Sequence, residues 1–127
     1  MPLTKISVPQ YLAASRVRAL ADAVQTGLVS TCNVPSDDCF QLINRFAADD
    51  MVLNPTFGGM ARTKDASIVE ITLLQGRSDD QKRALYQCVN DLAVVAGFKA
   101  DDIMMALTEN AAIDWTLGQG QSFQGHK

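Results

Sequence analysis

Residues 67–109, SIVEITLLQGRSDDQKRALYQCVNDLAVVAGFKADDIMMALTE, decide the fold. The stretch opens with an apolar run at 67–74 and closes with another at 103–109, and such runs are typical of buried strands. Between them, apolar residues recur at spacings of three and four, which predicts a helix over 78–96. The side chains expected on its inner face are Leu85, Val89, Leu92 and Ala96. The order strand, helix, strand makes one β-α-β unit.

Both ends of this helix carry local signals. Ser78 and Gln81 form the S-x-x-Q pattern of a capping box, in which side chains and backbone N–H groups at the helix start bond reciprocally. Asp79 and Asp80 add negative charge in the first turn, where the helix dipole favours it. Gly97 is placed to adopt the left-handed conformation that ends a helix.

The first half of the chain repeats this order, with a strand predicted at 3–8, a helix at about 11–32 and a strand at 39–46. The inner face of the helix is expected to hold Val17, Leu20, Val24 and Leu28. The second strand is expected to share one buried face among Phe40, Leu42 and Phe46. The break NVPSDD before this strand is echoed by FKADD before the last strand, and Asp38 and Asp102 are 64 residues apart (102 − 38).

Two such units predict an α+β fold. With right-handed crossovers, two β-α-β units related by an approximate two-fold axis merge into one four-stranded mixed sheet with both helices on one face. We expect a single domain over 1–127, with a first unit at about 2–46, a connecting segment at 47–66, a second unit at about 67–109 and a C-terminal arm at 110–127. The connecting segment contains Asn-Pro and Gly-Gly and predicts a short strand followed by a loop.

The remaining surfaces of this fold predict an oligomer. The sheet face away from the helices would present apolar side chains to water, which a soluble protein avoids by packing sheets together across subunits. The arm, WTLGQGQSFQG at 115–125, is too rich in glycine for a helix and too aromatic for a disordered tail. We expect it to pack on another surface, such as a neighbouring subunit.

Composition narrows the partners. The net charge of −3 and the pI near 4.9 argue against a nucleic-acid partner, because phosphate binding needs a basic face and none is visible in the sequence. No apolar run approaches the roughly 20 residues of a membrane-spanning helix. No basic segment followed by an apolar core marks a secretory signal, so we expect a cytoplasmic protein with small-molecule or protein partners.

The candidate metal ligands and thiol nucleophiles point to no cofactor chemistry. Cys32, Cys39 and Cys88 lack the C-x-x-C spacing of metal sites and are interpreted as reduced thiols that fill the core. The single histidine, His126, lies one residue from the end of the chain. We therefore expect no metal and no cofactor.

The topology brings three polar groups to one end of the sheet. Pro2 starts the first strand, and because the strands of one unit are parallel, it lies at the same end as Asp38, which precedes the second strand. The two-fold relation makes the second unit antiparallel to the first, so the sequence Gly76–Ser78, with Arg77, falls at that end too. At the mirror position, near Asp102, the chain is continuous at Ser67 and offers no free amine. The expectation is one site per subunit.

These groups suit proton transfer. If Met1 is removed, Pro2 presents a secondary amine. An α-amine has an ordinary pKa of about 7.7–8.0, and partial burial beside a cation lowers it towards neutrality, where it serves as acid or base. Arg77 offers a planar two-pronged donor for a carboxylate, supported by the start of the following helix. Asp38 can activate water, polarise the substrate or tune the amine.

Each residue also has a structural interpretation. Proline behind the initiator methionine is common. Arg77 could pair with Asp79 or Asp80 on the helix surface, and Asp38 could be a turn residue in PSDD. The convergence of the three at one end is what favours a catalytic site.

The chain resembles the tautomerase superfamily, and within it the malonate semialdehyde decarboxylase group. The resemblance rests on Pro2 ahead of a strand, the doubled β-α-β order, GRS followed by DDQK at 76–82, and TENAAIDWTLGQG at 108–120. It covers essentially the whole chain. It implies the tautomerase fold, a homotrimer, and an N-terminal proline as catalytic acid or base.

The resemblance also assigns residues. Pro2 matches the catalytic proline, Asp38 the decarboxylase aspartate and Arg77 the first arginine of an Arg-Ser-Arg motif. Trp115 and Leu117 fall where that group lines its pocket with apolar side chains. The chain departs from the pattern at Asp79, which stands in place of the second arginine and weakens any two-arginine clamp on a carboxylate.

The function expected from these features is an enzyme that uses the Pro2 amine on a small 2-oxo or 3-oxo carboxylic acid. Keto-enol tautomerisation, decarboxylation and hydration all remain open, because one fold hosts several of these reactions. The alternative is a non-catalytic ferredoxin-like oligomer that binds a metabolite or protein. A nucleotide site at GQGQSFQG has little support, since these glycines neither follow a clear strand nor precede a helix.

Overall fold

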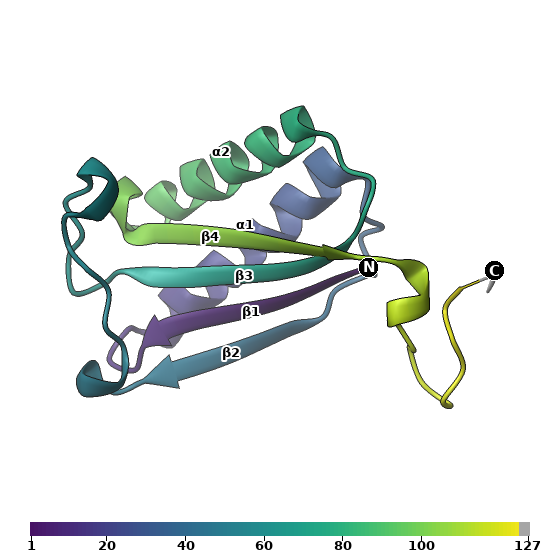
Figure 1. The fold of residues 1–127 in the computed structure, drawn as a ribbon. Coiled ribbons are helices and arrows are strands. Elements are labelled where there is room, and N and C mark those ends of the chain that lie inside the picture. The colour runs from purple at the N-terminus through teal and green to yellow at the C-terminus, as the bar shows by residue number, and fades with distance from the viewer. Residues whose placement is uncertain (125–127) are drawn as a thin grey trace.

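The computed structural model describes residues 1–124, and its core is one four-stranded sheet covered on one face by two helices (Figure 1). The strand order is β2-β1-β3-β4. The elements are β1 (Pro2–Pro9), α1 (Ala14–Cys32), β2 (Gln41–Phe46), β3 (Ser67–Leu74), α2 (Asp79–Val95) and β4 (Ile103–Asn110). The predicted α+β architecture, with a doubled β-α-β order, is confirmed.

The pairing register shows the internal repeat. β1 and β2 are parallel, β3 and β4 are parallel, and the central strands β1 and β3 are antiparallel. Thr4 pairs with Gln41, an offset of 37 (41 − 4), and Ser67 pairs with Ile103, an offset of 36 (103 − 67). Because the two halves pair almost identically, an approximate two-fold axis relates the two ends of the sheet.

The helices follow the sequence signals with two differences. The four inward residues expected in α1 are buried, and α2 begins with the Ser78–Gln81 capping box. Gly97, just past the C-cap Ala96, has a φ of 101°, as expected for the residue that stops the helix. α1 begins at Ala14 rather than near residue 11, because Leu12 N–H donates to the Pro9 carbonyl in a turn. In α2 the predicted burial of Leu92 is wrong: Ala93, four residues after Val89, is buried in its place and Leu92 is turned outward.

The two helices lie very close together at Gly27. A Cβ atom there would lie 2.9 Å from Val89 Cγ2 and 3.1 Å from Leu85 Cδ1. Real Cβ contacts this short are essentially absent, so the missing side chain lets the helices approach. Both helices together bury the inner face of the sheet, where Ile6, Val69 and Ile71 are almost fully covered.

The predicted burial of Phe40 and Leu42 is wrong within one protomer. Phe40 is 56% exposed and Leu42 is 52% exposed, and only Phe46 is partly covered. On β2 the helix-covered face belongs to the alternate residues, since Gln41 donates to the Ala21 carbonyl in α1 and Ile43 packs against the core. Leu42 therefore points to the uncovered face of the sheet.

The connecting segment contains no strand, so the short strand predicted there is wrong. It folds instead through two short 3₁₀ turns, Ala48–Asp50 and Phe57–Gly59. The Asn54 side chain accepts from the N–H groups of Thr56 and Phe57, and Arg62 donates to the Asn54 and Phe57 carbonyls. Side chains therefore satisfy backbone groups that a strand would pair with a neighbour.

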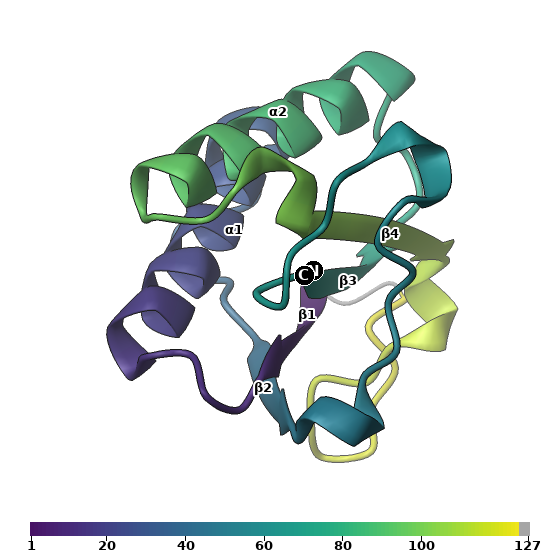
Figure 2. The ribbon, with the colours of Figure 1, turned by 90° about the vertical axis from the view of Figure 1, so that its left-hand side faces the viewer.

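The C-terminal arm forms a small hairpin beyond β4. A bridge joins Thr116 and Ser122, and Phe123 N–H donates to the Trp115 carbonyl. The hairpin projects beyond the end of the sheet where β1 begins, the amino-terminal end (Figure 1). The connecting segment closes the opposite end (Figure 2). No helix in residues 1–124 is long and apolar enough to cross a membrane.

Candidate active site

The amino-terminal end of the sheet holds an ion pair between the chain terminus and Asp38. Pro2 is buried at the start of β1, where it pairs with Leu73 of β3. The Met1 ammonium lies 2.8 Å from Asp38 Oδ2, and the Asp38 side chain is 18% exposed. The Pro2 nitrogen is one residue further into the chain and is part of the peptide bond to Met1. A carboxylate therefore lies directly beside the start of the first strand.

Asp38 is held in this position by its own backbone. Its N–H donates to the Pro35 carbonyl at 3.0 Å, and its carbonyl accepts from Gln25 Nε2 of α1 at 3.2 Å. The sequence PSDD thus forms a turn, as its residue types predict. The turn leaves the carboxylate free to face the terminus, so the structural and chemical interpretations of Asp38 are compatible.

Arg77 reaches the same end from the loop between β3 and α2. Its Nε donates to the Cys32 carbonyl at the end of α1, and its Nη1 donates to the Leu74 carbonyl at the end of β3, both at 3.2 Å. Among the described residues, no carboxylate lies within 4.0 Å of this guanidinium, and Asp80 pairs with Arg83 instead. The backbone therefore fixes the guanidinium, which has no ion-pair partner among the described residues.

Two further charged residues lie nearby that the sequence reading did not single out. Lys82, in the first turn of α2, lies 2.6 Å from Glu109 Oε1 near the end of β4. This hydrogen bond is the main cause that lowers the pKa of Glu109 and raises that of Lys82. The Gly76 N–H and the charge of Arg77 lower the pKa of Glu109 further. The sequence offered one signal for Glu109, because this residue lies near the end of a strand that finishes at this end of the sheet.

Trp115 and Leu117 occupy different surroundings. Trp115 is partly buried, and its indole N–H donates to Asn110 Oδ1 at the end of β4. Leu117 lies on the projecting hairpin and is 58% exposed. Within one protomer the structure therefore gathers the terminus, Asp38 and Arg77 at one end of the sheet and ties Trp115 to that end through Asn110. It leaves Leu117 in solvent.

At the opposite end of the sheet, the equivalent charged groups have different partners. Asp102, the equivalent of Asp38, is buried and accepts from the Thr63 N–H at 2.7 Å and from the Thr63 hydroxyl. Arg16, near the start of α1, donates to the Gly97 carbonyl at 3.0 Å and pairs with Asp65 at 3.1 Å. Each of these carboxylates and the Arg16 guanidinium has a partner within the chain, and the amino terminus lies at the other end of the sheet (Figure 1).

This geometry suits chemistry on a carboxylic acid. An amine at the chain terminus can accept and return a proton, a neighbouring carboxylate can stabilise its protonated form, and an unpaired guanidinium can hold the acid group. No group of three or more His, Cys, Asp or Glu residues in 1–124 could hold a metal ion.

Known proteins share this fold and its sequence features. A family model described as a tautomerase enzyme matches residues 38–118. The chain is 26% identical over 123 residues to the probable tautomerase YusQ of Bacillus subtilis (strain 168), an alignment that covers 96% of this chain and 97% of that protein.

Two solved structures of malonate semialdehyde decarboxylases share this fold. The FG41 malonate semialdehyde decarboxylase inhibited by 3-bromopropiolate superposes with a TM-score of 0.88 at 27% identity, covering 94% of this chain and 91% of that one. A second malonate semialdehyde decarboxylase, with decarboxylase and hydratase activities, superposes with a TM-score of 0.89 at 26% identity, covering 97% and 96%. Because the family match spans well over half of its residues, the chain belongs to the tautomerase family and is an enzyme.

Proposed function

We propose that this enzyme moves a proton on a small 2-oxo or 3-oxo carboxylic acid, with Pro2 as general acid and base. The observation that carries the proposal is the presence of two charged groups at one end of the sheet: a chain-terminal amine beside a carboxylate, and a guanidinium without an ion-pair partner within residues 1–124. The terminal ammonium lies 2.8 Å from Asp38, while Arg77 is fixed by two backbone carbonyls and has no carboxylate partner among the described residues. A substrate with one acid group and one oxo group would complete this arrangement.

The proposed reaction begins once Met1 has been removed. The Pro2 nitrogen then becomes a secondary amine at the start of β1, close to the carboxylate that now pairs with the Met1 ammonium. The neutral amine takes a proton from the carbon next to the carbonyl, and the electron pair of that C–H bond moves to give an enolate. The protonated amine returns the proton to the enolate oxygen, which gives the enol and restores the neutral amine.

Arg77 and Asp38 have separate roles in this proposal. Arg77 binds the substrate carboxylate through the edge of the guanidinium that the Cys32 and Leu74 carbonyls do not use. Asp38 stabilises the protonated amine after it has taken the proton. Neither role requires a cofactor.

The residue at position 79 bears on which substrate is favoured. Asp79 is exposed at the first position of α2, two residues after Arg77, where the decarboxylase motif has a second arginine. One guanidinium is enough to orient a single carboxylate, but an anion beside it opposes a substrate that carries two. We therefore expect a monocarboxylate, which leaves tautomerisation, decarboxylation and hydration as candidate reactions, and tautomerisation is tested first.

The proposal includes a homotrimer, as the family resemblance implies. Leu42 and Met104 lie on the uncovered face of the sheet and are 52% and 48% exposed, and Leu117 on the projecting hairpin is 58% exposed. Packing against other copies would cover these apolar side chains. Leu117 and Trp115 would then line a site at the boundary between two subunits rather than within one.

The test is the keto-enol exchange of phenylpyruvate, measured on protein whose loss of Met1 has been verified by intact mass. Pro2→Ala should lower kcat/KM by about 10²–10⁴-fold, the usual contribution of a positioned acid or base. Pro55→Ala is the matched control, because Pro55 is exposed in the connecting segment and should leave the rate unchanged. In partly processed preparations, activity should follow the fraction of chains without Met1. Equal rates for Pro2→Ala and the unmodified enzyme, or full activity with Met1 retained, would refute the role of Pro2.

A further inference from the structure

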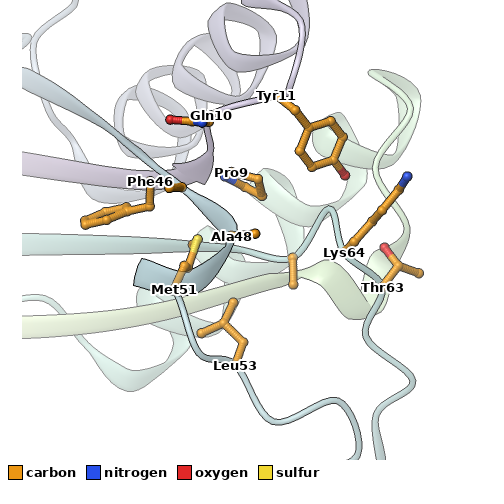
Figure 3. Close-up of a pocket in the computed structure, with 11 residues that line it drawn as sticks. Pro9, Gln10, Tyr11, Phe46, Ala48, Met51, Leu53, Thr63 and Lys64 are labelled. Carbon is orange, nitrogen blue, oxygen red and sulfur yellow. The ribbon is translucent and has the colours of Figure 1, made fainter.

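A cavity of about 410 Å³ lies at the end of the sheet opposite Pro2. It is formed where the ends of β1 and β2 meet the connecting segment, and residues that line it include Pro9, Tyr11, Phe46, Met51, Leu53 and Lys64. This volume falls within the range of about 300–1,000 Å³ that is usual for small-molecule sites. Figure 3 shows Tyr11 and Lys64 next to each other at one side of the cavity, with Met51 and Leu53 across from them.

The lining is mostly apolar, with the polar side chains of Gln10 and Thr63, and it carries one positive charge, that of Lys64. The Lys64 ammonium lies 5.3 Å from the centre of the Tyr11 ring, and none of the carboxylates in residues 1–124 pairs with it. Two acids near this end are already engaged, since Asp65 pairs with Arg16 and Asp102 accepts from Thr63. Asp49 and Asp50 follow the lining residue Ala48 but are not part of the lining. An apolar cavity with one unpaired cation fits an apolar molecule with one negative charge.

The place of this cavity in the internal repeat explains why it would bind without reacting. Pro9 and Tyr11, at and just beyond the end of β1, correspond under the two-fold axis to the residues around the end of β3 that lead to Arg77. Ala66, which precedes β3 and also lines the cavity, corresponds to the terminus ahead of β1. At Ala66 the chain is continuous, so the cavity has no chain-terminal amine of the kind that Pro2 would supply at the other end.

We propose that this cavity is a second binding site, distinct from the candidate active site, for a small amphipathic monocarboxylate. The apolar body of the ligand packs between Phe46, Met51 and Leu53, and its carboxylate binds the Lys64 ammonium beside Tyr11. The inference does not depend on the proposed reaction, because it concerns equilibrium binding at the other end of the sheet.

The experiment measures binding of 4-phenylbutyrate and of its uncharged analogue 4-phenylbutyramide to the purified full chain by calorimetry or ligand-observed NMR. The acid should bind more tightly than the amide, and Lys64→Met should weaken binding of the acid by about 10-fold or more, as expected for loss of a charged hydrogen bond. The amide should bind Lys64→Met and the unmodified protein equally. Leu53→Asp, which places an anion across from Lys64, should also weaken binding of the acid.

Two controls separate this site from the active site and from general charge effects. Lys99→Met removes a nearby lysine that is not among the lining residues and should leave binding unchanged. Arg77→Ala removes the proposed carboxylate-binding group of the candidate active site, so it should abolish only acid binding at that end and leave the Lys64-dependent part of the binding unchanged. The proposal is overturned if neither probe binds, if Lys64→Met binds the acid as tightly as the unmodified protein, or if Lys64→Met no longer weakens binding in the Arg77→Ala background.

Discussion

At the amino-terminal end of the sheet Asp38 meets a free ammonium group, whereas at the opposite end its equivalent, Asp102, meets the backbone N–H and hydroxyl of Thr63. The arginines differ in the same way. Arg77 and Arg16 each donate to a carbonyl at the C-terminal end of the other unit's helix, but only Arg16 also pairs with a carboxylate.

This difference shows how the two ends of an internal repeat can serve different purposes, with the charged groups at one end stabilising the fold and those at the other available to a ligand. At the opposite end both Asp102 and the Arg16 guanidinium have partners within the chain, so these two groups contribute to the stability of the fold rather than to the binding of an anion. Where a guanidinium keeps an unmatched charge beside an ionisable terminus, stability is given up for the ability to bind an anion. Three comparisons between the two units, and the pH dependence of one ion pair at the amino-terminal end, test this division, from the largest expected effect to the smallest.

Arg77→Met and Arg16→Met compare the two arginines. If Arg77 holds the substrate carboxylate, its removal should lower kcat/KM for phenylpyruvate by about 10- to 150-fold, the value of one or two charged hydrogen bonds. Arg16→Met should leave kcat/KM unchanged and lower the urea midpoint instead, because it breaks the pair with Asp65. Both variants should be assayed well below their unfolding transitions. Equal losses of activity in the two would mean that the ends of the sheet are not functionally different.

Asp102→Ala and Asp38→Ala compare the two carboxylates. Asp102 is only 1% exposed, so its removal leaves the Thr63 N–H without an acceptor and should lower the free energy of unfolding by about 1–3 kcal/mol. Asp38→Ala breaks a partly exposed ion pair and should cost about 0–1 kcal/mol. Urea denaturation measures both values. Asp102→Asn, which keeps an acceptor oxygen, should recover part of the loss, and an Asp38 variant less stable than Asp102→Ala would contradict the comparison.

The helix starts give a smaller contrast. α2 begins with a complete capping box at Ser78, whereas the N-cap of α1, Ala13, makes no side-chain hydrogen bond. Ser78→Ala should therefore lower the free energy of unfolding by about 1 kcal/mol, and Ala13→Ser should raise it by up to about 1 kcal/mol. Thermal denaturation detects both shifts. A neutral Ser78→Ala would show that the capping box is not needed once the helices are packed.

The Lys82–Glu109 pair should have the smallest effect, visible mainly through pH. Its hydrogen bond lowers the pKa of Glu109, so its contribution is fully present above the pKa of an unfolded glutamate and is lost as pH falls through the lowered folded value. The pKa of Lys82 is raised, so its share is lost only in strongly alkaline solution. The destabilisation caused by Glu109→Gln should therefore be present near neutral pH, disappear as pH falls through the lowered pKa of Glu109, and shrink in high salt. A penalty that persists at the lower pH would exclude the ion pair as its source.

Local signals in the sequence were the most reliable guides to the fold. The capping box at Ser78 and the stop at Gly97 depend only on residues within one turn, and both are present as predicted. The four-stranded mixed sheet, with the two units antiparallel to each other, follows from the right-handed crossover and the two-fold repeat, and it is confirmed as well. The same topology predicts which polar residues reach the amino-terminal end before any coordinates are available.

The errors arise where burial depends on distant parts of the chain. Phe40 and Leu42 were expected inside, but which face of β2 is covered depends on the side on which α1 and α2 lie. The strand expected in the connecting segment is replaced by the hydrogen bonds of Asn54 and Arg62. The Lys82–Glu109 pair joins residues 27 apart in the sequence, so no local pattern reveals it.

The close contact between the helices at Gly27 affects the hydrogen bonds at both ends of the sheet. Arg77 and Arg16 each donate a hydrogen bond to a carbonyl at the C-terminal end of the opposite unit's helix. Both hydrogen bonds therefore depend on the distance between α1 and α2. A methyl group at position 27 would act as a wedge against Leu85 and Val89. It would loosen the anion-binding end and the closed end together, although it lies in neither.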